Sequence, residues 1–107
     1  MNKTYDEDGW VAVLVNNSYG IGWSTAALYE LRESLMFDSA IVNIVRAATD
    51  GWEEEVILYC KEKYPDFYCI PHNLVVNWVK PGEAFFIEEY DGHESIKYIN
   101  HINFVVA

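Results

Sequence analysis

Residues 19–25 (YGIGWST) place two glycines, two aromatic side chains and two hydroxyl groups between an apolar run and a segment with helical apolar spacing. A strand, a glycine turn and a helix N-terminus can together bind an anion, because free N–H groups and the helix dipole point the same way. The glycines would let a ligand approach the backbone, while the aromatic rings could stack on a planar ring. In an alternative interpretation the loop is a tight turn whose aromatic residues cap the core. The candidate ligand-binding residues are Tyr19, Gly20, Gly22, Trp23, Ser24 and Thr25.

This glycine loop differs from the established nucleotide and hydrolase motifs. The lysine that follows the second glycine of a P-loop is missing. A single G-x-G without a parallel sheet does not make the dinucleotide fingerprint. Ser24 is the one plausible nucleophile, and no G-x-S-x-G motif surrounds it. The protein is therefore expected to bind rather than to catalyse, and no catalytic residue is predicted.

The second stretch with chemical potential is EEYDGHES (88–95), where four carboxyl groups lie close to His93 in the sequence. Carboxylates beside a histidine could bind a divalent metal, do acid–base chemistry or grip a ligand. The alternative is a solvated hairpin tip, since Asp-Gly is a strong hairpin signal. Neither an EF-hand spacing nor an HExxH pattern is present. The candidate ligand-binding residues here are Glu89, Tyr90 and Asp91.

The histidines and cysteines do not form a metal pattern. His72, His93 and His101 share no helical or strand ligand spacing, and Cys60 and Cys69 fall on different predicted elements. No metal or cofactor is predicted. Two cysteines are also too few for a disulfide framework, which favours a reducing cytoplasm.

The elements that position these residues begin with a strand over 9–17, whose run of valines predicts a central strand buried on both faces. A helix is expected from Ala26, with Leu28, Leu31 and Leu35 on its buried face and a hydroxyl of residue 24 or 25 as its N-cap.

Two further helices follow in the pattern. Asp38 is expected to cap the second helix, and Asp50 with Glu53 resembles a capping box for the third. The inner face of the third helix is expected to contain Val56, Ile57, Cys60 and Tyr64, with Pro65 ending it.

The last 40 residues are rich in β-branched and aromatic residues, separated by turn signals. Pro81-Gly82 suits a type II turn. The predicted strands cover 66–70, 74–79, 83–90, 95–99 and 102–106. The sequence therefore predicts an α+β fold with an N-terminal strand, two to three helices and a mostly antiparallel β-meander, with the helices packed on one face.

Length and charge set the broad class. The 107 residues predict one domain, 1–107, with residues 1–8 frayed. A net charge of −10 disfavours direct binding to nucleic acid or anionic lipid, and it suits either simple solubility or a basic protein partner. The acidic first residues carry no signal-peptide pattern, and no apolar run has the length of a membrane span.

Three stretches, YGIGWST, KYPDFYC and VVNWVKPGEAFFIEEYDGHESI, resemble a family of small, uncharacterised tailed-phage proteins. Its pattern is Gly-Phe/Tyr-Gly-Ala-Gly-Trp-Ser-Thr-Trp, then Val-x-Trp-Val/Ile and Glu-Tyr-Asp-Gly-x-Glu-Ser-Ile. The sequence departs from that pattern at Ser18, Ile21 and Ala26. If the missing tryptophan lines a pocket, the pocket is wider here or its ligand differs. The resemblance implies a phage origin, the cytoplasm of an infected bacterium and a role against host defences.

Two functions of different class follow. In the first, the protein is a non-enzymatic anti-defence protein that sequesters a small nucleotide-like immune signal at the glycine loop. In the second, it is an acidic nucleic-acid mimic that inhibits a host defence nuclease or CRISPR complex by protein–protein binding. A small enzyme using the carboxylates near His93 is a third, less favoured hypothesis. The many aromatic residues would also permit a homodimer.

Overall fold

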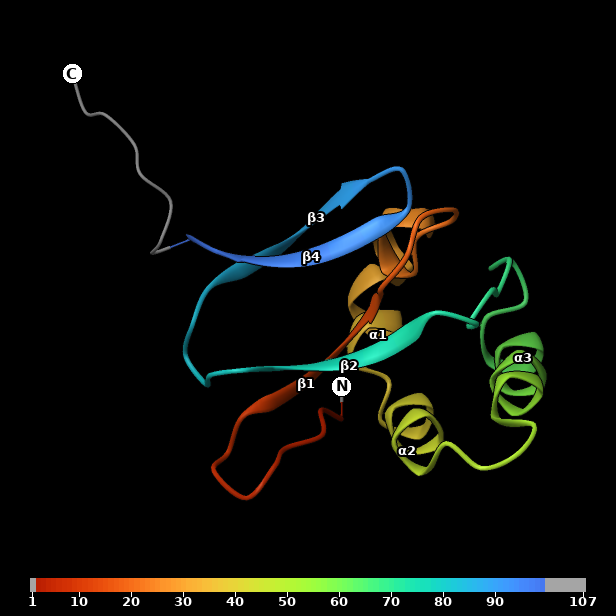
Figure 1. Ribbon diagram of the computed structural model, residues 1–107, viewed down its shortest axis with the longest axis horizontal. Helices are drawn as coiled ribbons and strands as arrows, with labels where there is room; N and C mark the ends of the chain where they lie inside the picture. The colour runs from red at the N-terminus through yellow and green to blue at the C-terminus, as the bar shows by residue number, and fades with distance from the viewer. Residues whose placement is uncertain (1, 100–107) are drawn as a thin grey trace.

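The computed structural model describes residues 2–99, so the strand predicted at 102–106 lies outside the described residues. The chain folds into a strand, a glycine loop with short helical turns, three helices and three further strands (Figure 1). In order these are β1 (Val11–Asn16), the 3₁₀ turns η1 (Ser24–Ala26) and η2 (Tyr29–Leu31), α1 (Arg32–Phe37), α2 (Ser39–Ala47), α3 (Trp52–Lys63), β2 (Leu74–Val79), β3 (Phe85–Tyr90) and β4 (His93–Tyr98).

The strands form two antiparallel pairs, which confirms the α+β class. β1 pairs with β2, with Val11 opposite Val79 and Asn16 opposite Leu74. β3 pairs with β4 in a hairpin, with Tyr90 opposite His93. The sequence predicted one meander, whereas the described residues form two separate two-stranded sheets.

β1 lies between two apolar clusters, and its alternating side chains serve both. Ala12 and Leu14 pack with residues of α2 and α3, while Val13 and Val15 pack with residues of the β3–β4 hairpin. Figure 1 shows the same order, with the blue hairpin on one side of β1 and β2 and the yellow and green helices on the other. The prediction that this strand is buried on both faces is confirmed, but the prediction that it is central is wrong, because it belongs to a two-stranded sheet with β2.

The predicted helix from Ala26 is interrupted. The chain makes two 3₁₀ turns before α1 begins at Arg32, and Leu28 is exposed rather than buried. Neither turn has a side-chain N-cap, so the expected cap from Ser24 or Thr25 is absent. The Thr25 hydroxyl instead bonds to the carboxylate of Glu94.

Of the capping predictions for the two later helices, the one for α2 is confirmed and the one for α3 is wrong. Asp38 caps α2 as expected, because its carboxylate accepts a hydrogen bond from the amide of Ile41 at 3.1 Å. The Asp50 capping box is wrong, since the N-cap of α3 is Gly51 and no side chain bonds there. Pro65 follows the end of α3 at Lys63, as predicted.

The turns agree with the sequence. The amide of Glu83 donates to the carbonyl of Lys80, and Gly82 has a φ of 81°, as the third residue of a type II turn requires. The predicted strand at 66–70 is wrong, because this segment is irregular.

The N-terminal segment, which the sequence analysis expected to be frayed, makes hydrogen bonds within itself and to β1. The carboxylate of Asp6 accepts hydrogen bonds from the amides of Asp8 and Trp10, and the amide of Ala12 donates to the carbonyl of Thr4. Among the helices of residues 2–99, none has both the length and the apolar character that crossing a bilayer requires.

Candidate functional site: the glycine loop and the β3–β4 hairpin tip

The two stretches singled out in the sequence lie against each other. The amide of Gly20 in the loop donates to the carbonyl of Asp91 at the hairpin tip, at 2.7 Å. Gly92 has a φ of 88° and is buried, and a Cβ at this position would overlap the backbone of Gly20. Glycine is therefore required at residue 92 both for the turn and for the contact with the loop.

The side chain that joins them is Glu94, the second residue of β4, which is 2% exposed. Its Oε2 accepts hydrogen bonds from the amides of Trp23 and Thr25, at 2.9 and 3.1 Å, and from the Thr25 hydroxyl at 2.5 Å. Its Oε1 accepts from the amide of Asn16 at 2.8 Å. Four donors therefore surround one buried carboxylate, which is how a protein compensates the loss of water around a charge.

Asn16, at the end of β1, adds a second link to the hairpin. Its side-chain nitrogen donates to the carbonyls of Ser18 and Gly92, at 2.6 and 2.8 Å. The end of the strand, the loop and the hairpin tip are thereby fixed to one another.

Gly22 is the second glycine of the loop, and two side-chain atoms occupy the space beside its Cα. A Cβ at residue 22 would overlap Thr25 Oγ1 and Glu94 Oε2. The prediction that glycine lets an anion approach the backbone describes this geometry, but the anion is the protein's own carboxylate.

Trp23 is 1% exposed, and its indole N–H donates to the carbonyl of Leu35 at 3.0 Å. Its ring packs edge-on against Phe67, with the ring centroids 5.0 Å apart. The expectation that Trp23 stacks on a bound ring is therefore wrong, because the indole belongs to the core.

The predicted anion cradle is also filled. Ser24 is 1% exposed, and the amides of Trp23 and Thr25 already donate to Glu94. A ligand would have to displace a buried carboxylate to reach them. The alternative interpretation, a tight turn whose aromatic residue closes the core, describes this part of the loop.

Other candidate residues are exposed. Tyr19 and Tyr90 are 66% and 75% exposed, with their ring centroids 6.5 Å apart in an edge-to-face arrangement. The ring of Tyr19 also lies beside the ring of His93, with the ring centroids 5.7 Å apart. Asp91 is exposed with a φ of 52°. We call the exposed side chains of Tyr19, Ile21, Glu88, Tyr90 and Asp91 the loop–hairpin surface.

Glu89 helps to hold the hairpin tip. Its Oε2 accepts a hydrogen bond from the amide of Gly92 at 2.6 Å. The carboxylate of Glu94 points inward to the loop amides rather than toward an acid–base pair with its neighbour His93. Within residues 2–99, no three His, Cys, Asp or Glu side chains are placed to hold a metal ion.

The sequence interpretation missed the role of Glu94, although a signal was present. Glu94, Ile96 and Tyr98 alternate along β4, and Ile96 and Tyr98 pack on the apolar cluster beneath the hairpin. An acid in this register faces the protein interior and needs donors. The sequence analysis had predicted free N–H groups in the glycine loop, and these are donors that such an acid could use.

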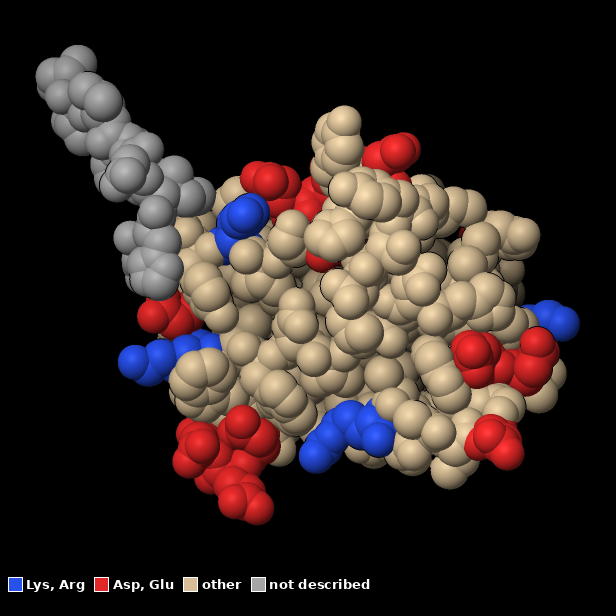
Figure 2. Space-filling model, viewed as in Figure 1, with Lys and Arg blue, Asp and Glu red and all other residues tan. Residues whose placement is uncertain are grey.

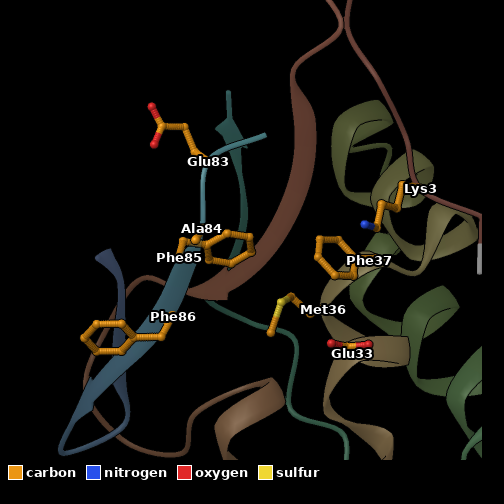
Figure 3. A pocket seen from close by; sticks show the side chains of 8 residues that line it. All are labelled: Lys3, Glu33, Met36, Phe37, Glu83, Ala84, Phe85 and Phe86. Carbon is orange, nitrogen blue, oxygen red and sulfur yellow. The ribbon is translucent and has the colours of Figure 1, made fainter. Parts of the chain in front are cut away.

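A separate groove runs between α1 and β3 (Figure 3). Phe85 of β3 projects toward Phe37 of α1, with Met36 between the two elements, whereas Phe86 projects the other way. This part has a volume of about 540 Å³. An adjoining hollow of about 530 Å³ is lined in part by Ser24, Thr25 and Arg32, and Arg32 itself bonds to the carbonyls of Ala27 and Thr25.

Most of the acidic side chains lie at the surface and form no ion pair within the described residues. Of the 17 acidic residues, Asp38 and Glu94 are the buried ones. Between residues 2 and 99, the single ion pair joins Lys63 to Asp38, at 3.2 Å. Figure 2 shows acidic side chains gathered at several separate places around the edge of one face, with an uncharged area between them.

Comparisons with known proteins found no matching family model, no matching curated protein and no matching solved structure.

Proposed function

We propose that the protein is a phage-encoded, non-enzymatic anti-defence protein that binds a basic groove on a host defence nuclease or CRISPR complex. The phage origin rests on the sequence resemblance, and the site rests on the loop–hairpin surface. The observation that carries the proposal is the pair of exposed rings, Tyr19 and Tyr90, beside exposed carboxylates on a frame fixed by Glu94.

The chemistry of this surface suits a protein that normally holds nucleic acid. Carboxylates such as those of Glu88 and Asp91 can occupy the positions of phosphates, and exposed tyrosine rings can occupy those of stacked bases. Tyrosine is also enriched among the residues that carry most of the energy of protein interfaces. The net charge of −10 would steer the protein toward a basic partner.

Sequestration of a nucleotide-like ligand at the glycine loop receives less support. It required open amides at the start of the helix and an accessible Trp23, whereas the amides of Trp23 and Thr25 donate to Glu94 and Trp23 is 1% exposed. Protein–protein binding needs only the exposed part of the same site.

The test is capture from a bacterial lysate on immobilised protein, followed by competition with duplex DNA. We expect capture of a nucleic-acid-binding protein that high salt weakens and that duplex DNA displaces. The Tyr19→Ala/Tyr90→Ala variant should bind this partner at least about 30-fold more weakly, because truncating an interface anchor costs about 2 kcal/mol.

The matched control is Tyr5→Ala/Tyr68→Ala, which removes two exposed tyrosines, 58% and 76% exposed, whose adjoining hollows are lined by no residue of the glycine loop or the hairpin. This control should bind like the wild type. Equal loss in both variants, or a captured partner that duplex DNA does not displace, would contradict the proposal. Native mass spectrometry showing a retained nucleotide would restore the ligand hypothesis.

A further inference from the structure

The two cysteines, nine positions apart in the sequence, lie together in the structure. Cys60 is in the last turn of α3 and is buried, and Cys69 follows in the irregular segment after Pro65 and is half-buried. Their side chains are close enough for each thiol to affect the pKa of the other. The sequence did not predict this contact because Cys69 was assigned to a strand.

Both thiols line a cavity of about 290 Å³ between the end of α3 and residues 65–69. Phe67 and Tyr68 form part of its wall, and Lys61 contributes a cationic side chain at the same site. Lys61 is exposed, so a small anionic molecule could meet its ammonium group while reaching the sulfur atoms.

The surroundings make the two sulfur atoms different. The hydrogen bond from Cys60 lowers the pKa of the Cys69 thiol and outweighs the effect of burial. The hydrogen bond to Cys69, together with burial, raises the pKa of the Cys60 thiol. Cys60 is 1% exposed whereas Cys69 is half-buried, so Cys69 is the sulfur that a disulfide in the cavity can reach, and its lowered pKa favours the thiolate that attacks.

We propose that Cys60 and Cys69 form a site of thiol–disulfide exchange with a small anionic disulfide such as glutathione disulfide, in which Cys69 attacks and Cys60 resolves. This site is independent of the loop–hairpin surface.

The reaction balances in two steps. The Cys69 thiolate attacks one sulfur of glutathione disulfide, so that a protein–glutathione disulfide forms and one glutathione thiolate leaves. Cys60 then gives up its proton and attacks Cys69 Sγ, which closes the Cys60–Cys69 disulfide and releases the second glutathione. Two protein thiols are oxidised, one glutathione disulfide is reduced to two thiols, and the protons end on the departing thiolates.

The test follows the intact mass of the folded protein during incubation with glutathione disulfide. The wild type should lose the mass of two hydrogen atoms and regain it with dithiothreitol. Cys60→Ser should stop after gaining one glutathionyl group, and Cys69→Ser should stay unmodified in the same time.

A second comparison separates recognition from simple exposure. Lys61→Ala should slow the reaction with anionic glutathione disulfide several-fold but leave the reaction with neutral hydroxyethyl disulfide unchanged. Brief alkylation of the unmodified wild type, mapped by peptide, should label Cys69 before Cys60 even if a serine variant fails to fold. Equal labelling of the two cysteines, or a mixed disulfide in the wild type that never closes, would overturn the proposal.

Discussion

Glu94 carries a charge that is balanced by backbone amides and one hydroxyl rather than by a basic side chain. Glu94→Gln keeps the shape of the side chain but replaces one acceptor oxygen with a donor NH₂ group. That group would face either the amides of Trp23 and Thr25 or the amide of Asn16. We expect the free energy of unfolding to fall by about 2–3 kcal/mol, since a buried donor without an acceptor costs about that much. Urea denaturation measures it.

The control for this substitution is Glu88→Gln on the neighbouring strand. Glu88 is exposed, so the same chemical change should alter the free energy of unfolding by no more than about 0.5 kcal/mol. Equal effects at residues 88 and 94 would mean that Glu94 does not hold the loop.

At the residue scale, the sequence correctly indicated that the loop binds an anion, but the anion is a side chain of the protein and not a separate ligand. The glycines and the amides of the loop do form an anion-binding arrangement, but Glu94 supplies the anion from 71 positions away from Trp23. Local spacing cannot show such a contact, because it depends on where the hairpin folds back. Trp23 was misplaced for the same reason, since the carbonyl of Leu35 that accepts its N–H belongs to the next helix.

At the scale of the elements, the hairpin and the loop form one unit. Substituting two glycines in turn distinguishes the cost of losing the loop–hairpin contact from the cost of straining a turn. Gly92→Ala and Gly82→Ala both place a Cβ at a positive φ, but only residue 92 meets another backbone segment, that of Gly20. We expect Gly82→Ala to cost about 1 kcal/mol and Gly92→Ala clearly more, because the loop must move away from the hairpin. Urea denaturation of both variants gives the comparison, and equal costs would remove the argument.

The N-terminus of α2 makes stability depend on pH. Burial alone would raise the pKa of Asp38, but hydrogen bonds from Tyr64, the amide of Ile41, Tyr59 and Lys63 outweigh it and lower that pKa. A carboxylate with a lowered folded-state pKa stabilises the fold above the unfolded-state pKa of about 3.9. This contribution is lost as the pH falls from about 4 through the folded-state value.

Asp38→Asn tests this dependence. The amide can still cap α2, but it carries no charge for the phenol groups and Lys63. We expect a loss of about 1–3 kcal/mol at pH 7 that shrinks as the pH is lowered below 4. Urea denaturation at several pH values measures the difference between variant and wild type, and a difference that is constant with pH would contradict the assignment.

Elements with strong local signals were predicted well, and those that depend on tertiary contacts were not. Asp38, with Phe37 before it and Val42 after it at the spacing of a hydrophobic staple, was correctly identified as a cap, and Asp91-Gly92 as a turn. Residues 24–31 have helical spacing but make two 3₁₀ turns, and in the first of them the amide and the hydroxyl of Thr25 bond to Glu94. Residues 66–70 have strand composition, yet Phe67 and Cys69 pack against the core without pairing.

At the scale of the whole molecule, an experiment can distinguish whether the position of the negative charges or only their number matters for binding. Glu88→Gln/Asp91→Asn and Glu54→Gln/Glu55→Gln each remove two negative charges from exposed side chains. Asparagine also tolerates the positive φ of residue 91. If the loop–hairpin surface binds the partner, the first variant should dissociate at lower salt in the capture experiment, and the second should behave like the wild type. Equal shifts would mean that only net charge matters.

The order and class of the elements could be predicted, but their division into two sheets could not. The pattern of the last strands indicates antiparallel pairing, and β2, β3 and β4 lie close to their expected positions. The choice of β1 as the partner of β2 is a contact between distant parts of the chain. It separates the hairpin as a sheet of its own on the opposite side of β1 from α2 and α3.

The link from Glu94 to Asn16, Trp23 and Thr25 also bears on how the protein is made. A ribosome adds about 5–20 residues each second, so roughly 4 to 14 seconds separate the synthesis of Trp23 from that of Glu94. During that interval the nascent loop has polar groups that only water can satisfy. The N-terminal part of the polypeptide therefore acquires its final shape late in translation or after it.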